Sequence, residues 1–197
     1  MGQTGAGLCR AKTKKGRFEM EIVKAKKTDI DEIEKIYENI HDEEEAGRAT
    51  IGWIRGVYPT RKTAEDALDR GDLFVLKDEG QTVAAAIINR IQVEEYKYAA
   101  WKHEAKAEEI MVLHSLVVDP QVKSKGYGKG FVAFYQTYAK QHSCKALRMD
   151  TNARNQRARA LYKTLGFEEV GIVECVFNGI PHVQLVCLEK YLGENEA

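Results

Sequence analysis

The amino-acid sequence predicts a mixed α/β fold in which helices pack on one central sheet. Short apolar runs rich in β-branched residues alternate with segments of helical periodicity, in the order βααβββαβαββ. The chain has 197 residues, enough for one sizeable core and few for two. We therefore expect one domain over residues 19–197, preceded by a flexible arm over 1–18 that is rich in Gly, Lys and Thr.

Helical segments follow the first strand. Behind a capping Thr28, isoleucines three and four residues apart give a helix one buried face. The acidic run Asp42–Glu45 is expected to end this helix. A second helical segment then carries Trp53 and Tyr58, and a third spans residues 62–70. The isoleucine face should pack on the sheet.

Seven strands are predicted from apolar runs that are bounded by turn residues. In chain order they span Glu19–Lys24, Leu73–Lys77, Thr82–Gln92, Ile110–Val118, Ala146–Thr151, Val170–Val176 and His182–Leu188. An Asp-Glu-Gly-Gln turn makes the second and third strands a hairpin, and Asn178-Gly179 lies between the last two. Between the fourth strand and the last two come a helix with an aromatic face, the fifth strand and a helix over Gln156–Leu165.

Charge and cysteine content narrow the classes of function. Lys plus Arg number 30 and Asp plus Glu number 30, so no overall field attracts nucleic acid or an anionic membrane. The four cysteines lie far apart without a CxxC pair, which disfavours a zinc site and favours free thiols in a reducing compartment. No apolar run reaches the roughly 18 to 20 residues of a membrane helix. We therefore expect a cytoplasmic protein without nucleic-acid or membrane partners.

A glycine-rich turn joins the fourth strand to the aromatic-faced helix. Its glycines, Gly126, Gly128 and Gly130, let the main chain approach a ligand, while the first N–H groups of the helix have no partner within it. With the helix dipole and three nearby lysines, these groups form an anion site that suits a diphosphate. The GxGxG spacing matches neither a P-loop nor a Rossmann fingerprint. A glycine-rich helix start with solvated lysines explains the spacing equally well.

Two motifs, in this order along the chain, resemble those of the GCN5-related N-acetyltransferase (GNAT) family. In that family a strand ending in Leu-x-Val-x-Pro precedes Q/R-x-x-G-x-G/A. Here Leu116-Val117-Val118-Asp119-Pro120 precedes Lys123-Ser124-Lys125-Gly126-Tyr127-Gly128, with Lys123 where Gln or Arg is usual. The second motif is an Asn-x-x-Ala-x-x-Leu-Tyr-x-x-x-Gly-Phe helix, which is matched by Asn155, Ala158, Leu161, Tyr162, Gly166 and Phe167. The resemblance is strong over 113–170 and covers 19–192 in outline.

The resemblance implies a fold, a co-substrate and a reaction. The fold would be a mostly antiparallel twisted sheet of six to seven strands, split between the fourth and fifth and flanked by four or more helices. Acetyl-CoA would be the co-substrate, no metal would take part, and an acceptor amine would attack the thioester directly. The residues that match cofactor-binding positions are Leu116, Val117, Val118, Lys123, Ser124, Lys125, Gly126, Tyr127, Gly128, Lys129, Asn155 and Tyr162.

Tyr162, His114 and Glu109 are the candidates for catalysis. The family has a tyrosine hydroxyl by the departing thiolate, and Tyr162 matches that position. An alkyl ammonium with a pKa of about 10.4 must lose a proton before it attacks, which costs roughly 4.6 kcal/mol at pH 7. His114 and Glu109 lie on or just before the fourth strand, where family members often carry the base. A solvated carboxylate and a hydrogen-bonded histidine are equally good interpretations of these two.

The sequence does not determine the acceptor. Asp42–Glu45, Trp53 and Tyr58 lie where this family builds its acceptor pocket, and acidic and aromatic groups suit a cationic amine. A solvated surface explains the acidic run as well. A polyamine, an aminoglycoside, an amino acid or a protein amine all fit, and homodimers are common in the family. Three other classes stay open: a non-catalytic acyl-CoA sensor, a nucleotide-phosphate binder and a protein-interaction domain.

Overall fold

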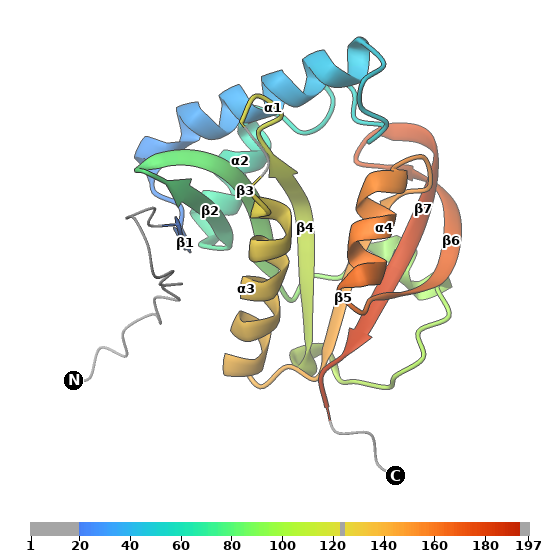
Figure 1. Ribbon diagram of the computed structural model, residues 1–197. Helices are drawn as coiled ribbons and strands as arrows, with labels where there is room; N and C mark the ends of the chain where they lie inside the picture. Colours follow the sequence, from blue (N-terminus) through green and yellow to red (C-terminus); the bar gives the residue numbers. More distant parts are fainter. Residues whose placement is uncertain (1–19, 123–124, 194–197) are drawn as a thin grey trace, which may run out of the picture.

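Seven strands form the sheet that organises the protein (Figure 1). The structure is a computed structural model, and it describes residues 20–122 and 125–193. The strands are β1 Met20–Lys24, β2 Leu73–Asp78, β3 Gln81–Asn89, β4 Ile110–Val118, β5 Ala146–Asn152, β6 Glu168–Phe177 and β7 Ile180–Tyr191. Their order is β1-β2-β3-β4-β5-β7-β6, and every neighbouring pair is antiparallel except β4 with β5. The predicted sheet is therefore confirmed, whereas the arm over 1–18 lies outside the described residues.

Helices cover both faces of this sheet. Within the described residues the α-helices are α1 Ile30–Glu45, α2 Arg61–Arg70, α3 Tyr127–Gln141 and α4 Gln156–Thr164. The side chains of α1 and α2 form one core cluster with β2 and β3, and its fully buried members include Ile33 and Val75. On the opposite face, α3 and α4 belong to a second cluster, and its fully buried members include Phe131 and Leu147. None of these helices is long and apolar enough to cross a membrane.

Two predictions about the region between α1 and α2 are wrong. α1 continues through the acidic run Asp42–Glu45, because glutamate is a good helix former and Arg55 pairs with carboxylates of the run. No helix forms over 53–58. Gly52 and Gly56 there have φ of +84° and +75°, a left-handed conformation that an α-helix does not contain. The other predicted elements agree with the structure to within a few residues.

The sheet splits between β4 and β5, as the family resemblance implies. The parallel pairing runs from Ile110 with Ala146 to Leu113 with Met149, and the two strands then part. On its other side β4 stays paired with β3 as far as Val118. Beyond Leu113, main-chain groups of β4 therefore face the split without a strand partner.

Residues 90–109 form a long connection between β3 and β4 and cover the sheet beside α1 and α2 (Figure 1). Tyr96 is its buried anchor, with 2% of its surface exposed. The Trp101 ring lies 4.0 Å from the Arg148 guanidinium, and the Lys102 N–H donates to Glu189 Oε2 at 2.9 Å. The connection therefore packs firmly against β5 and β7, and it closes one side of a cavity.

Candidate functional site

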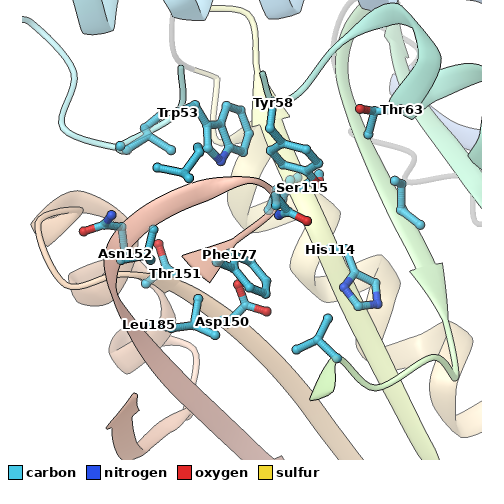
Figure 2. A pocket seen from close by; sticks show the side chains of 18 of the residues that line it. Trp53, Tyr58, Thr63, His114, Ser115, Asp150, Thr151, Asn152, Phe177 and Leu185 are labelled. Carbon is cyan, nitrogen blue, oxygen red and sulfur yellow. The ribbon is translucent and has the colours of Figure 1, made fainter. Parts of the chain in front are cut away.

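A cavity of about 440 Å³ opens on the sheet face where β4 and β5 part (Figure 2). Side chains from α2, β3, β4, β5, α4 and β7 line it, together with the 51–58 loop, the 90–109 segment and the turn between β6 and β7. It lies between the core cluster under α1 and α2 and the cluster under the 90–109 segment. Its walls come from both halves of the sheet, so the folded chain is needed to assemble them.

Asp150 contributes a carboxylate to this cavity. It follows Met149, the last residue of β5 to pair with β4. The carboxyl group is enclosed by protein but keeps exposed surface on the cavity, and the Tyr96 hydroxyl donates to Oδ2 at 2.8 Å. Burial raises the pKa of Asp150 to about 6, against the opposing hydrogen bond from Tyr96 and with a small further increase from the charge of Glu95. The group is therefore ionised at pH 7 and titrates just below it.

His114 lies across the split on β4 and also lines the cavity. Its Nε2 is 3.1 Å from both Asn89 Oδ1 and the Ile91 carbonyl oxygen. Because both partners are acceptors, Nε2 carries the proton of the neutral ring, and Nδ1 holds the lone pair. Burial lowers the pKa of His114 to about 4, so the imidazole is neutral at pH 7.

Tyr162 and Glu109 lie in different environments. Tyr162 lines the cavity from α4, packs against Phe167 at a ring distance of 6.2 Å, and has 7% of its surface exposed. Burial and then the charge of Asp150 raise the pKa of Tyr162, so the phenol keeps its proton. Glu109 precedes β4 and does not line the cavity; its carboxylate pairs with Lys145 at 2.6 Å, which lowers the pKa of Glu109.

The glycine turn leaves the start of α3 open. Gly126 is the residue before α3 and has a φ of +77°, and no side chain of the described residues caps the helix. A Cβ added at Gly126 would meet no atom of the described residues within 4 Å, whereas one at Gly128 would lie 3.5 Å from Leu161 Cδ2. The first N–H groups of α3 thus border open space that an anion can enter. Lys123 and Ser124, predicted to bind the cofactor, lie outside the described residues.

Side chains of the same turn are held by Asp78 at the end of β2. Lys125 Nζ lies 2.8 Å from Asp78 Oδ2, and the Tyr127 hydroxyl donates to the same oxygen at 2.5 Å. These two partners, Lys125 first, lower the pKa of Asp78. The ammonium predicted to face a phosphate is thus engaged in fixing the turn, while Lys129 is exposed in the first turn of α3.

The remaining predicted cofactor residues lie at the split. Val117 and Val118 pair with β3 on one side and have no β5 partner on the other. Leu116 follows Ser115, whose φ of +51° marks the bulge where β4 shifts register against β3. Asn155 lines the cavity and also caps α4, since its Oδ1 accepts from the Ala158 N–H at 3.2 Å.

Aromatic side chains form another part of the cavity wall. Trp53 and Tyr58 meet edge to face, with ring centroids 6.0 Å apart, and Phe177 joins them from the end of β6 (Figure 2). The Tyr58 hydroxyl makes a hydrogen bond with Ser115 Oγ, which ties this wall to the bulge in β4. A cationic or partly apolar ligand would suit these rings.

The acidic run Asp42–Glu45 lies outside the cavity lining and organises the loop that carries Trp53. Glu44 accepts the Ile51 and Gly52 N–H groups at 2.7 and 2.9 Å. Gly52 in turn lies so close to β5 that an added Cβ would be 2.5 Å from Asn152 Nδ2. The acidic run therefore influences the shape of the cavity indirectly, because Glu44 holds the main chain of the loop that carries Trp53.

Sequence reasoning overlooked Asp150 and its partner Tyr96. A signal for Asp150 exists, because it is a carboxylate at the end of an otherwise largely apolar strand beside the predicted split. Tyr96 lies in a connection for which the sequence predicts no element, 54 positions from Asp150. No local pattern links the two.

Comparison with known proteins identifies the family to which this sequence is similar. The model of the acetyltransferase (GNAT) family matches residues 31–167. The uncharacterized N-acetyltransferase YhfO of Bacillus subtilis is 36% identical to the chain over 70 residues. That stretch covers 35% of this chain and 47% of YhfO, so the match spans about half the length of that relative.

Solved structures resemble the fold at lower sequence identity. An acetyltransferase of the GNAT family from Streptococcus agalactiae 2603 has a TM-score of 0.73 and 21% identity, over 89% of this chain and 96% of that one. The structure of yncA from Salmonella typhimurium with its cofactor acetyl-CoA has a TM-score of 0.63 and 17% identity, over 90% and 96%. At these identities the likeness concerns the fold alone.

Proposed function

Because this chain belongs to the GNAT acetyltransferase family, we propose that it transfers an acetyl group from acetyl-CoA to a primary amine by direct attack. The observation that carries the proposal is the split between β4 and β5. Its β4 wall continues into the glycine turn before α3, and its β5 wall continues into α4, which carries Tyr162. The split thus joins an open helix start to a cavity with a tyrosine hydroxyl and a carboxylate.

Acetyl-CoA supplies the acetyl thioester. The unpaired main-chain groups of Leu116–Val118 would hold its pantetheine arm, and the N–H groups at the start of α3 would hold its diphosphate. Two features support this fit: the open space around Gly126 and the free edge of β4 beyond Leu113. The acetyl-CoA in the structurally similar yncA supports the choice of co-substrate.

We assign to Tyr162 the protonation of the departing sulfur. Tyr162 lines the cavity, and its hydroxyl takes part in none of the hydrogen bonds among the described residues. Its raised pKa keeps the phenol protonated throughout the physiological range, so it serves as a hydrogen-bond donor to developing negative charge.

The acceptor nitrogen also needs a base. At pH 7 an alkyl ammonium with a pKa of about 10.4 is neutral in roughly one molecule in 2,500, a barrier of about 4.6 kcal/mol. Two groups at the mouth of the split, Asp150 and His114, can take the proton directly or through a water. Glu109 is too far along β4 to share the cavity with them.

Release of free thiol from acetyl-CoA tests the proposal. We expect release that requires both the protein and a primary amine. The rate should also depend on the size of the amine, because aromatic rings form part of the cavity wall. A rise in Tm with acetyl-CoA but no thiol release with any amine would identify the alternative, a non-catalytic acyl-CoA sensor. If ATP displaces acetyl-CoA, the site is a nucleotide-phosphate site instead.

We further propose a cytoplasmic protein. Cys144, Cys175 and Cys187 are free thiols, as expected in a compartment that keeps cysteines reduced. Alkylation of cells before lysis should modify the accessible thiols without prior reduction. A homodimer stays a prediction from the family resemblance, and light scattering of the purified chain measures it.

A further inference from the structure

We propose that Asp150 is the general base of this site and that Tyr96 positions its carboxylate. The inference rests on the proposed acetyl transfer and extends it, because neither residue belongs to the motifs that carry the family resemblance. Asp150 is the residue of β5 that follows its last pairing with β4, and it faces the cavity where the strands part (Figure 2). An acceptor in the cavity would therefore meet this carboxylate at the split.

Four carboxylates of the described residues are buried, and each pairs with a cation. The pairs are Asp29 with Lys77 at 2.6 Å, Asp72 with Arg70 at 2.9 Å, Asp78 with Lys125 at 2.8 Å and Glu189 with Arg148 at 3.5 Å. Asp150 differs from them because no cation that the structure describes pairs with it. Asp150 instead accepts a hydrogen bond from the neutral Tyr96 phenol, at 2.8 Å. An enclosed carboxylate without a cation is unfavourable unless a ligand supplies the charge. The ammonium group of an acceptor is such a ligand.

The 90–109 segment holds the Tyr96 phenol in place. Tyr96 has 2% of its surface exposed, and the Trp101 Nε1–H donates to its carbonyl oxygen at 2.7 Å. The two rings lie 5.0 Å apart, and the Ala100 N–H donates to the Val170 carbonyl at 3.2 Å. The phenol engages Oδ2 of Asp150, and Oδ1 has no hydrogen bond within the described part of the chain. One carboxylate oxygen is thus fixed and the other is available for a proton.

Titratable groups surround Asp150 from every neighbouring element. They are Glu95 and Tyr96 from the 90–109 segment, Tyr58 from the 51–58 loop, His114 from β4, Tyr162 from α4, Cys175 from β6 and Cys187 from β7. The charged side chains of Asp66 and Arg70 line the same cavity from α2. Burial raises the pKa of the tyrosines and cysteines and lowers that of His114, so these groups are neutral at pH 7. The pKa of Asp150, about 6, exceeds that of His114, about 4, so the carboxylate is the stronger base.

The proton and electron count of the step is complete. One ammonium proton passes to the Asp150 carboxylate, and the freed nitrogen lone pair forms a bond to the carbonyl carbon of the thioester. The carbon–sulfur bond breaks and its electron pair stays on sulfur. Sulfur gains a proton from Tyr162, and the second proton that the nitrogen loses passes through solvent to reprotonate the Tyr162 phenolate. Asp150 then releases its proton to solvent, so the products are an amide, the CoA thiol and one H⁺.

The pH dependence of kcat/KM tests the assignment. Acetyl-CoA is used with benzylamine, spermidine, L-lysine and a hexapeptide that begins with alanine, and the fastest of these serves for the profiles. The wild type should lose activity as the pH falls through about 6. Asp150→Asn should lower kcat/KM by about 100-fold or more at pH 7.5 and abolish this acid limb. His114→Gln is the matched variant, and it should keep the limb near pH 6.

Tyr96→Phe separates positioning from packing. The hydrogen bond from Tyr96 lowers the pKa of Asp150, so its removal should move the acid limb to higher pH while the limb itself persists. A titration of side-chain carboxyl carbons by NMR gives the same readout without an acceptor. The resonance that disappears in Asp150→Asn should titrate near pH 6, and it should titrate at higher pH in Tyr96→Phe.

The outcomes distinguish this inference from the proposed function. Acetyl-CoA should raise the Tm of Asp150→Asn as much as that of the wild type, which shows that the variant is folded and binds its co-substrate. Wild-type kcat/KM in Asp150→Asn would overturn the base assignment, and an unmoved limb and carboxyl titration in Tyr96→Phe would overturn the positioning role of Tyr96. Either result would leave the transferase proposal standing. Absence of amine-dependent thiol release in the wild type would overturn both.

Discussion

His114 and Asp150 stand on either side of the split, each one residue beyond the last pair that joins β4 to β5. That pair is Leu113 with Met149, and the next residue on each strand lines the cavity (Figure 2). Burial lowers the pKa of His114 to about 4 and raises that of Asp150 to about 6. Both shifts favour the neutral form. The stability of the protein should therefore depend on pH through both residues, with opposite sign.

We expect Asp150→Asn to stabilise the protein at neutral pH. The folded-state pKa of Asp150, about 6, lies above its ordinary value of 3.8. The stabilisation linked to a raised pKa is complete below the unfolded value and is lost as the pH rises through the folded one. At pH 7.5 the ionised carboxylate then costs on the order of 3 kcal/mol that the amide does not. Urea denaturation at pH 7.5 and 4.5 measures this, and an equal advantage of the variant at both pH values would refute the shift.

His114→Gln should change the pH dependence of the free energy of unfolding in the opposite direction to Asp150→Asn. A depressed histidine pKa contributes stability above the unfolded value of 6.5, and the contribution is lost as the pH falls through about 4. Protonation of His114 should therefore lower the free energy of unfolding of the wild type by about 3 kcal/mol. Glutamine does not titrate, and its side chain can still donate a hydrogen bond to the Ile91 carbonyl. We expect the free energy of unfolding to fall less between pH 7 and 4.5 in the variant. Parallel curves for the two proteins would show that His114 titrates normally.

The sequence predicts well those elements whose formation depends on their own residues and on their immediate neighbours in the chain. β4 begins and ends at the predicted residues because its β-branched run is bounded by turn residues, both local properties. The 51–58 loop is different, since Glu44 and Asn152 hold it from other elements. A helical spacing of apolar residues there reflects their shared place around a cavity, and two glycines with positive φ bend the chain.

The residues of the site also fall into those that a local motif predicts and those that only long-range packing brings together. Tyr162 belongs to a motif within one helix, and the structure brings it to the cavity with His114. Glu109 shares a strand region with His114 but lies at the end of β4 where β5 is still paired, so its carboxylate meets Lys145. The Tyr96 hydroxyl reaches Asp150 only because the 90–109 segment packs across β5. Long-range packing of this kind leaves no signal in a single sequence.

Tyr162→Phe should lower kcat about 10-fold to 100-fold with little change in the affinity for acetyl-CoA. The ring packs against Phe167, and phenylalanine keeps this contact, so the change removes the hydroxyl alone. Steady-state kinetics with acetyl-CoA and the preferred amine measures kcat, and a thermal-shift titration measures acetyl-CoA binding. Unaltered kcat would remove Tyr162 from the mechanism, while a large loss of affinity would assign it to binding.

Gly126→Ala should weaken acetyl-CoA binding, and Gly130→Ala is its matched control. Gly126 has a φ of +77°, so a side chain there introduces strain of about 1–2 kcal/mol even though its Cβ would meet open space. Gly130 lies within α3 and its added Cβ also meets nothing within 4 Å, so alanine should stabilise the helix by about 0.5–1 kcal/mol. Calorimetric titration with acetyl-CoA compares the two. Equal affinities for both variants would show that the geometry of the turn does not govern binding.

Glu44→Ala should raise KM for the amine and leave KM for acetyl-CoA almost unchanged. Glu44 accepts the main-chain N–H groups of Ile51 and Gly52, and this fixes the loop from which Trp53 reaches the cavity wall. Hydrogen bonds to a charged acceptor stabilise by about 1.5–3 kcal/mol, so their loss should free the loop and raise the amine KM roughly 10-fold. Glu43→Ala is the control, because Glu43 pairs with exposed Arg48 at 2.8 Å on the same helix end. Should both variants raise the amine KM equally, the charge of the acidic run would matter to the acceptor and the position of the loop would not.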